Sequence, residues 1–255
     1  MMNGIFDTHA HYDDEQFDSD RAELFASFKN KGVELIMNCA TNLNSVKSTL
    51  ALANENDFIY AAAGLHPEDI LDSEESEIEV IKRVALEEKK VKAIGEIGLD
   101  YYWKEVPREK QLIFFEKQIL LAKELDLPVI VHDREAHEDT LNLIKKYAPK
   151  GVMHCFSGSA EMAKEVLKTG MYIGIGGALT FKNAKKILKV ADEVPIEKIL
   201  LETDCPYMAP VPFRGKRNDS SLIKYVAERL GEIKGMSEEE VIDICNKNGR
   251  KLFEI

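Results

Sequence analysis

Six side chains that can bind divalent metal ions stand close to the ends of short apolar runs in this chain of 255 residues. Imidazole nitrogens and carboxylate oxygens, without thiolates, suit zinc, manganese, magnesium or nickel, and the ligand types alone do not choose among these metals. The six candidates are His9, His11, Glu96, His132, His154 and Asp204.

The spacing of the candidates suggests how they share ions. His9 and His11 are two residues apart, so an extended strand points both imidazoles to one face, where they can hold one ion together. Glu96 can bridge two ions through its two oxygens, while His132 and His154 offer a nitrogen pair for the second ion. Any single histidine could be an ordinary core residue. The whole set predicts two divalent ions per chain, of Mg, Mn or Zn.

Such a centre is suited to hydrolysis. Two ions about 3.5–4 Å apart lower the pKa of a shared water and neutralise phosphate oxygens. Asp204 is expected to orient that water and accept its proton, so Asp204 and the bridging Glu96 are the candidate catalytic residues. Protonated imidazoles cannot bind metal ions, so activity is expected to fall as the pH drops through the range where histidines become charged.

The ligands meet only if the strands that carry them end at a common edge. Strands are expected near residues 4–9, 33–39, 58–64, 91–97, 128–132, 151–155, 171–175 and 198–203, each followed by a helical segment. Right-handed crossovers between sequential parallel strands close naturally into a barrel. We therefore predict an α/β fold of the TIM-like (β/α)8 barrel class, with residues 1–255 as one domain. In a closed barrel the last strand lies beside the first, which would bring Asp204 to His9.

Two helices have clear signals. Pro107 is favoured in a first helical turn, and apolar residues such as Leu112 and Ile119 then recur on one face. Ser237, followed three residues later by Glu240, predicts a capping box at the start of the last helix.

Charge and cysteine content narrow the class of protein. A net charge of −11 disfavours tight, sequence-independent binding of duplex nucleic acid, although Arg214-Gly215-Lys216-Arg217 supplies local positive charge. The four cysteines form no CxxC and are expected to be reduced. Strand alternation predicts that Cys155 and Cys205 point away from the ligands that precede them.

The chain shows no sign of membrane insertion. Its start lacks a basic segment and a long apolar stretch. The longest uncharged apolar-rich run, residues 170–181, is shorter than the ~20 residues that a membrane-spanning helix requires. We expect a cytoplasmic protein with no membrane partner and no obligate protein partner.

Several motifs are distributed from residue 7 to the C-terminal helix. They are Thr8-His9-Ala10-His11, Gly64-Leu65-His66-Pro67, Gly95-Glu96-Ile97-Gly98-Leu99-Asp100-Tyr101, His154-Cys155-Phe156-Ser157-Gly158, Gly174-Ile175-Gly176-Gly177, Glu202-Thr203-Asp204-Cys205-Pro206 and Arg214-Gly215-Lys216-Arg217-Asn218. Together they resemble the signature segments of the TatD-type metal-dependent deoxyribonucleases, within the amidohydrolase superfamily.

This resemblance implies a TIM-like barrel, two divalent cations and hydrolysis of DNA phosphodiesters, often as a 3′-to-5′ exonuclease on single strands. It also implies a division of the ligands: one ion held by His9, His11 and Asp204, the other by His132 and His154, with Glu96 as the bridge.

Four further residues are expected to contact a single-stranded DNA substrate: His66, Arg134, Arg214 and Trp103. The three basic side chains, on predicted loops at the rim, could clamp phosphate or could be ordinary surface charges. Trp103 could stack on an unpaired base or pack as a hydrophobic lid. The segment Asp133-Arg134-Glu135-Ala136 departs from the Ser-Arg-Asp-Ala associated with the family, and the added carboxylate predicts weaker phosphate binding. Gly174-Ile175-Gly176-Gly177 could admit a phosphate or allow tight packing.

Two other functions stay open at this point. A barrel with an activated water can also attack a carbonyl carbon, so the main alternative is a metal-dependent amidohydrolase or esterase, for example one that hydrolyses aminoacyl-tRNA esters. Glu96 stands where carbonyl hydrolases of the superfamily commonly carry a carboxylated lysine, which favours the nuclease. The second alternative is a non-catalytic barrel scaffold, and the retention of all six ligands argues against it.

Overall fold

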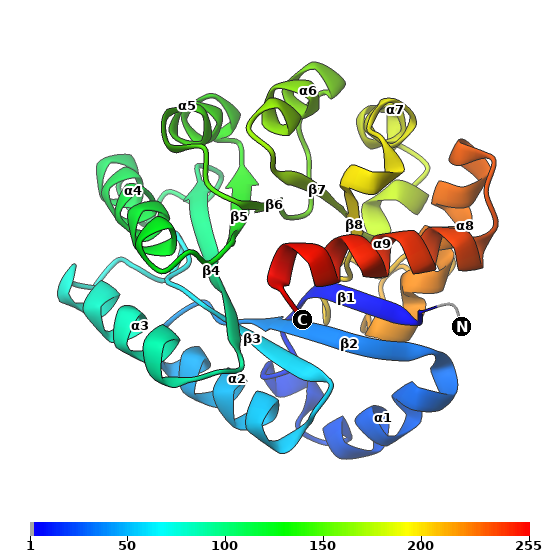
Figure 1. Cartoon of the computed structure of the whole chain (residues 1–255), viewed down its shortest axis with the longest axis horizontal. Helices are drawn as coiled ribbons and strands as arrows, with labels where there is room; N and C mark the ends of the chain where they lie inside the picture. Colours follow the sequence, from blue (N-terminus) through cyan, green and yellow to red (C-terminus); the bar gives the residue numbers. More distant parts are fainter. Residues whose placement is uncertain (1–2) are drawn as a thin grey trace.

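Eight parallel strands form one sheet whose order follows the sequence, in a computed structural model that describes residues 3–255. The strands are β1 (Ile5–Ala10), β2 (Val33–Cys39), β3 (Ile59–Ala63), β4 (Val91–Asp100), β5 (Val129–Arg134), β6 (Gly151–Met153), β7 (Tyr172–Ile175) and β8 (Ile199–Leu201). Helices alternate with the strands and surround them, so the predicted (β/α)8 barrel is confirmed (Figure 1).

The α-helices bury their apolar faces against the strands. They are α1 (Arg21–Phe28), α2 (Leu43–Glu55), α3 (Ser76–Glu87), α4 (Arg108–Glu124), α5 (His137–Tyr147), α6 (Ala160–Lys168), α7 (Lys185–Glu193), α8 (Ile223–Lys234) and α9 (Glu238–Phe253). Pro107 is the N-cap residue of α4, so that helix begins one residue later, at Arg108, and its Ile119 is fully buried as predicted. The capping box between Ser237 and Glu240 is also confirmed.

Five short 3-10 helices complete the connections. They are η1 (Glu15–Phe17), η2 (Lys29–Lys31), η3 (Gly177–Thr180), η4 (Ile196–Lys198) and η5 (Ser220–Leu222).

A seam between β8 and β1 closes the barrel without a regular ladder. Within residues 3–255, a single bridge joins Ala10 to Cys205 there, and the Asp204 amide donates a hydrogen bond of 2.9 Å to the His9 carbonyl oxygen. The buried carboxylate of Asp7 strengthens the seam by accepting hydrogen bonds from both the amide and the hydroxyl of Thr203. The seam therefore brings Asp204 next to His9, as a closed barrel predicts.

The interior of the barrel is packed with side chains and plugged by the last helix. The interior cluster takes one to three residues from every strand and includes Phe6, Met37 and Ile130. Leu252 and Phe253 of α9 complete it, and the Phe253 ring lies 5.9 Å from the Phe6 ring, centroid to centroid. Figure 1 shows α9 lying across the barrel beside β1 and β8.

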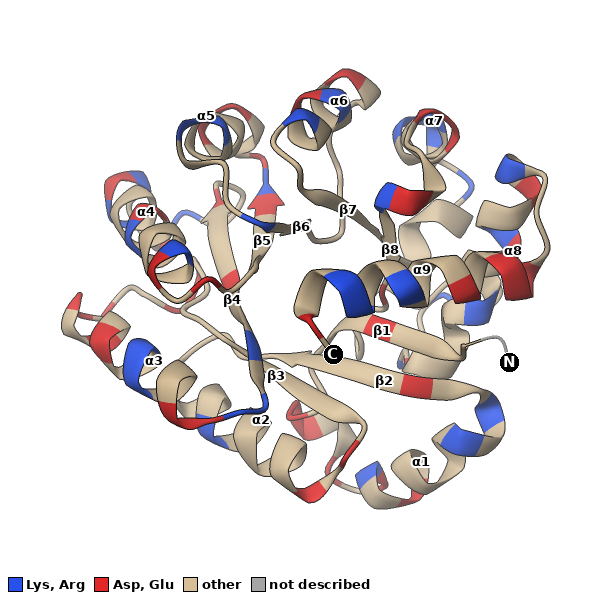
Figure 2. Cartoon of the chain, viewed as in Figure 1, with Lys and Arg blue, Asp and Glu red and all other residues tan. Residues whose placement is uncertain are grey.

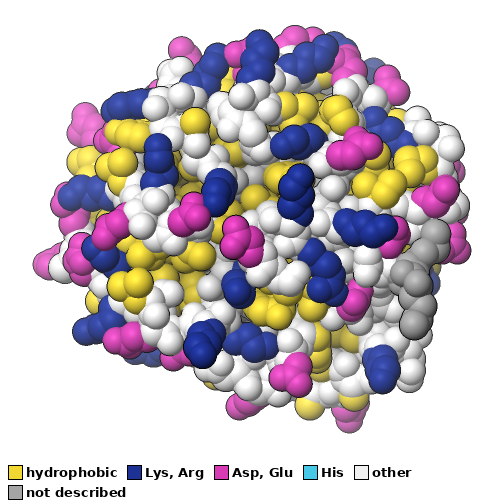
Figure 3. All heavy atoms as spheres, viewed as in Figure 1, with side chains coloured by type: hydrophobic (Ala, Val, Ile, Leu, Met, Phe, Trp, Pro, Cys, Tyr) yellow, Lys and Arg dark blue, Asp and Glu magenta, His cyan; other side chains and the backbone are white. Residues whose placement is uncertain are grey.

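Charged residues lie mainly on the helices, whereas the strands carry few of them (Figure 2). On the face seen in Figure 3, basic and acidic side chains are intermixed, and none of the described histidines is visible. No helix among residues 3–255 combines the length and apolar character needed to span a membrane.

Four strand ends, those of β4, β5, β6 and β8, differ from the prediction. β4 continues past Glu96 to Asp100, because its last residues pair with β5 as far as Arg134. Arg134 is therefore the last residue of β5, and the prediction that it lies on a loop is wrong. Conversely, β6 stops at Met153 and β8 at Leu201, so His154 and Asp204 lie just beyond their strands.

Cys155 does not point away from the ligand that precedes it, contrary to the strand-alternation argument. It lies outside β6 with a left-handed φ of 41°, which breaks the alternation, and its sulfur lies within 4.8 Å of ligand atoms of His154 and Asp204. Cys205 is buried in the outer core, as expected.

Candidate metal centre

The Glu96 carboxylate is surrounded by imidazoles at the open end of the barrel. Its Oε2 atom faces the Nε2 atoms of His9 at 3.2 Å and His11 at 3.6 Å. Its Oε1 atom faces Nδ1 of His132 at 3.0 Å and Nε2 of His154 at 3.6 Å. The two oxygens of one carboxylate thus address two separate histidine pairs, which is the geometry that a bridging ligand requires.

The first pair lies beside Asp204. The Nε2 atoms of His9 and His11 are 3.0 Å apart, and the Oδ1 atom of Asp204 lies 3.8 Å and 3.4 Å from them. Ligands of a tetrahedral ion with bonds of about 2.0–2.2 Å are about 3.3–3.6 Å from one another, so these spacings are close to those expected around a cation. The set offers nitrogen and oxygen atoms only, which suits a divalent ion such as zinc, manganese or magnesium.

Hydrogen bonds on the far side of each ring select the nitrogen that faces the centre. Nδ1 of His11 donates to the Cys39 carbonyl oxygen at 2.8 Å, which directs Nε2 inward. Nε2 of His132 donates to the Asp100 carboxylate at 2.9 Å, which directs Nδ1 toward Glu96. Such outer partners fix the orientation of a metal-binding histidine and raise its basicity.

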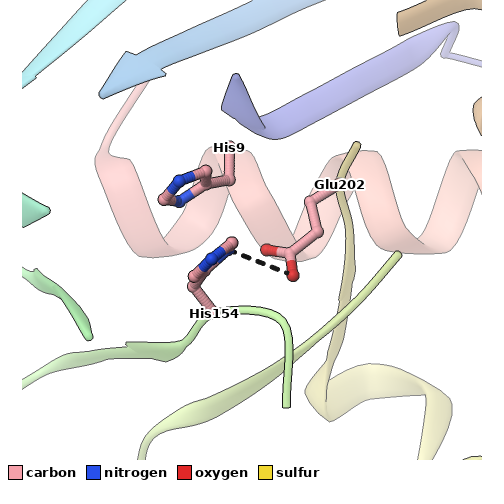
Figure 4. A group of neighbouring side chains, drawn as sticks. All are labelled: His9, His154 and Glu202. Atoms are coloured by element: carbon pink, nitrogen blue, oxygen red, sulfur yellow. Dashed lines mark ion pairs between the residues drawn. The ribbon is translucent and has the colours of Figure 1, made fainter. Parts of the chain in front are cut away.

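Glu202 faces His154 as an ion-pair partner without a hydrogen bond. Oε1 of Glu202 lies 3.4 Å from Nδ1 of His154, an atom that is buried and makes no hydrogen bond (Figure 4). The same Glu202 oxygen accepts a hydrogen bond from the Cys155 amide. The His154 ring also stacks on the His9 ring, with centroids 3.5 Å apart. The second oxygen of Glu202 is buried without a hydrogen-bond partner, and a Cβ at Gly174 would come within 2.5 Å of it. Gly174 therefore serves tight packing, the second of the two possibilities raised by its glycine-rich motif.

His66 differs from the four histidines predicted to be ligands. Its Nε2 atom also faces Glu96, at 3.6 Å, but its Nδ1 atom accepts a hydrogen bond from the Glu68 amide. A neutral imidazole that accepts through Nδ1 carries its proton on Nε2. Since burial lowers the pKa of His66 to about 4, the ring is neutral at pH 7 and presents a donor to the cleft.

The pKa values of the central groups reflect the close packing of carboxylates and imidazoles, which suits the binding of cations. Burial alone would raise the pKa of Glu96, but His9, His66 and His154 around it hold that pKa well below its usual range. Burial lowers the pKa of His132 and of His11, yet the neighbouring carboxylates outweigh it and raise these values to about 10 and about 9. In the metal-free protein both imidazoles are therefore protonated at pH 7, and a metal ion would replace these protons.

The centre opens into a cleft of about 680 Å³. Three of the residues predicted to contact substrate line it: His66, Trp103 and Arg134. Arg214 is not among the residues that line the cleft, because its guanidinium packs 3.7 Å from the centre of the Phe181 ring. The Asp133 carboxylate turns away to His137, at 2.8 Å, so the added carboxylate next to His132 does not enter the cleft.

The sequence reasoning missed the two carboxylates that orient histidines. Asp100 is four residues from Glu96 on β4, and an even spacing places both side chains on one face of a strand. Glu202 is two residues from Asp204, although β8 has already ended there. The first could have been found from alternation, whereas the second depends on the path of the chain beyond its strand.

A model of the TatD related DNase family matches residues 6–254. The chain belongs to this family. Its sequence is 45% identical over 254 residues to the uncharacterized metal-dependent hydrolase YabD of Bacillus subtilis, covering 98% of this chain and 99% of that protein. It is also 35% identical over 257 residues to the uncharacterized metal-dependent hydrolase YcfH of Escherichia coli K12, covering 98% of this chain and 96% of that protein.

Solved structures agree with the sequence comparison. The crystal structure of YjjV, a TatD homologue from Escherichia coli K12, superposes with a TM-score of 0.93 at 32% identity and covers 98% of each chain. A TatD family hydrolase from Entamoeba histolytica gives a TM-score of 0.87 at 25% identity and covers 99% of each chain. The chain is therefore a metal-dependent hydrolase with a TatD-type barrel, as its motifs predicted.

Proposed function

We propose that this hydrolase cleaves DNA phosphodiester bonds, as a 3′-to-5′ exonuclease on single strands, with two divalent ions per chain. The match to the TatD related DNase family supports DNA as the substrate class. The observation that carries the two-ion arrangement is the Glu96 carboxylate, whose two oxygens face two different histidine pairs at 3.0–3.6 Å. His9, His11 and Asp204 would hold one ion, and His132 and His154 the other.

The residues of the centre have distinct tasks in this scheme. Bound divalent ions supply Lewis acidity and lower the pKa of water. Glu96 fixes the spacing of the two ligand groups. Asp204, which is partly exposed to the cleft, orients the attacking water and accepts its proton.

Two side chains are placed to hold the phosphate. The neutral His66 offers the N–H group of Nε2. Arg134 is the one lysine or arginine among the described residues that line the cleft. Arg214 would contact only more distant parts of a DNA strand, since it lies outside the cleft.

The proposal is tested by digestion of single-stranded DNA labelled at the 5′ end, beside RNA and duplex DNA, with and without Mg²⁺, Mn²⁺ or Zn²⁺. We expect metal-dependent shortening of single-stranded DNA from its 3′ end and none in the presence of a chelator. His132→Ala is the control that rules out a contaminating nuclease. Full activity with chelator present, or in this variant, would contradict the proposal.

A second candidate activity is favoured by the acidic character of the cleft. The cleft is lined by one basic side chain other than histidine, Arg134, and by four carboxylates that are not proposed ligands: Asp13, Asp14, Glu68 and Asp69. A positively charged amino group suits such walls, so aminoacyl-tRNA ester hydrolysis is the alternative, within the wider class of metal-dependent amidohydrolases and esterases. An assay of a phosphodiester and an aminoacyl ester with one metal-loaded preparation distinguishes the two.

We also propose that residues 1–255 act as one domain in the cytoplasm and need no obligate protein partner. A sedimentation experiment on the active protein, together with fractionation of cells that produce it, tests these points.

A further inference from the structure

A second cavity, of about 330 Å³, adjoins the metal cleft at its Trp103 wall. Glu68, Asp69 and Trp103 line both spaces, so a substrate held at the centre can extend into the cavity. Its volume falls at the lower end of the ~300–1,000 Å³ typical of small-ligand sites. We call it the base cavity, and its remaining walls are Pro67, Glu105, Val106 and Gln111.

The walls of the base cavity favour a flat, uncharged, hydrogen-bonding group. Pro67, Val106 and the indole of Trp103 provide apolar surface, while the carboxylates of Asp69 and Glu105 offer hydrogen-bond acceptors. Burial raises the pKa of Glu68 to about 7, so near neutral pH this third acidic side chain can donate as well as accept. No lysine or arginine is among the described residues that line it, so the cavity would repel a phosphate. A nucleobase meets these conditions, because its face can stack on an aromatic ring and its exocyclic amino group donates to carboxylates.

The chain fixes Trp103 relative to the metal centre. Oδ1 of Asp100 accepts hydrogen bonds from the amides of Tyr102, at 2.9 Å, and Trp103, at 3.1 Å. The other oxygen of Asp100 accepts from His132, so one carboxylate orients both a metal-facing imidazole and the stacking wall. The indole is 45% exposed, which leaves surface free for a base.

Arg134 lies on the other side of this wall. Its guanidinium packs 4.0 Å from the centre of the Tyr102 ring and 5.8 Å from that of Trp103, and it lines the cleft but not the base cavity. The positive charge for a phosphate thus lies in the cleft and the apolar surface for a base in the adjoining cavity, and Trp103 lines both spaces.

We propose that the base cavity binds the unpaired nucleobase adjacent to the scissile phosphate, with its face on Trp103. This inference rests on the proposed DNA substrate and adds the position of one base. It gives a physical reason for single-strand preference, since a paired base cannot leave its stack to enter the cavity without an energetic cost. Bases with an exocyclic amino group bind more tightly than thymine, because the carboxylates at the walls accept from that group.

Trp103 is the single tryptophan of the chain and lines both the cleft and the base cavity, so its fluorescence responds to ligands in either space, and the base-free phosphate measures the part of the change that comes from the cleft. We would titrate Mg²⁺-loaded protein with deoxycytidine 5′-monophosphate, thymidine 5′-monophosphate and the base-free 2-deoxyribose 5-phosphate. The cytosine nucleotide is expected to change the emission saturably and to bind about 5- to 150-fold more tightly than the base-free phosphate, with an intermediate affinity for thymidine 5′-monophosphate. Unchanged emission, or equal binding of the nucleotide and the base-free phosphate, would overturn the inference.

Two variants test the same point by calorimetry. Val106→Phe fills the cavity and Trp103→Ala removes its stacking wall; both should weaken binding of deoxycytidine 5′-monophosphate and leave that of 2-deoxyribose 5-phosphate unchanged. Leu86→Phe, at a position 68% exposed on α3, is the control, and metal content and melting temperature show that the variants fold. If the variants bind the nucleotide like the parent protein, the cavity is not the base site, even where single-stranded DNA is still cleaved. If the parent protein cleaves no DNA, the proposed function itself fails.

Discussion

Glu96 is the single residue that connects the two halves of the candidate metal centre. Its carboxylate is almost fully buried and stands between two histidine pairs, so both proposed ions depend on it. Asp100 and Glu202 form an outer layer that holds His132 and His154. The ligand types were evident in the sequence, whereas Glu202 was not, because its role depends on how the chain turns after β8.

Asp204→Asn should separate proton transfer from metal binding. The amide retains an oxygen that can coordinate an ion, but it cannot accept the proton of the attacking water. We expect kcat on single-stranded DNA to fall about 10²- to 10⁴-fold, while the metal content measured by elemental analysis changes little at saturating metal. Asp72→Asn, at an exposed position, is the matched control. Wild-type turnover of Asp204→Asn would refute the role of Asp204 as base.

Glu202→Gln should weaken metal binding without a change of shape. The glutamine can still accept the hydrogen bond from the Cys155 amide, but it lacks the negative charge that faces Nδ1 of His154. Affinity for the second ion should drop about 10- to 100-fold, as measured by competition with a chelator. Glu197→Gln, exposed on η4, should leave affinity unchanged. An affinity equal in the two variants would count against the orienting role of Glu202.

At the scale of elements, the sequence predicted the number, order and type of the strands, because buried parallel strands form continuous apolar runs separated by helical segments. The predicted strand ends were less accurate at β4, β5, β6 and β8. β4 runs on because pairing with β5 continues beyond the apolar run, and the chain leaves β6 and β8 through residues with positive φ, Cys155 and Asp204. Tertiary pairing and loop geometry of this kind are not encoded in local hydrophobicity.

Phe253 should contribute to stability and not to chemistry, since α9 plugs the barrel at the end away from the cleft. Phe253→Ala removes a ring that is 1% exposed and is expected to lower the free energy of unfolding by about 3–5 kcal/mol, measured with urea. The folded Phe253→Ala variant, at urea concentrations below its unfolding transition, should bind metal with the affinity of the parent protein. Leu86→Ala, on the exposed surface of α3, should cost less than about 0.5 kcal/mol. If the free energy of metal binding fell by more than the free energy of unfolding, α9 would also shape the metal centre.

For the whole molecule, bound metal should add stability by mass action. A ligand that binds only the folded state at 100 times its dissociation constant adds about 2.7 kcal/mol, which corresponds to a rise in melting temperature of about 5–10 °C for a chain of this size. Differential scanning fluorimetry with and without chelator measures this rise. His132→Ala should show a smaller rise, and an equal rise in both proteins would point to metal binding elsewhere.

Metal binding should also release protons. The pKa values of His11, about 9, and His132, about 10, lie above the ordinary value of 6.5, so both rings are charged in the metal-free protein at pH 7.5. Their charge stabilises the metal-free fold fully below pH 6.5, and this contribution is lost as the pH rises through 9 and 10. Metal must displace about two protons at pH 7.5, so apparent affinity should increase with pH. Calorimetry in buffers of different ionisation enthalpy detects the release; an identical heat in every buffer would contradict it.

The seam between β8 and β1 has a consequence for synthesis of the protein. On the proposed assignment, His9 and Asp204 hold the same ion, and the hydrogen bond between their backbones forms only when the last strand reaches the first. A nascent or prematurely terminated polypeptide that stops before residue 204 carries most of the ligands but lacks the proton acceptor. Unfinished chains should therefore be harmless to the nucleic acid around them, and catalytic competence should arise only once the ring is complete.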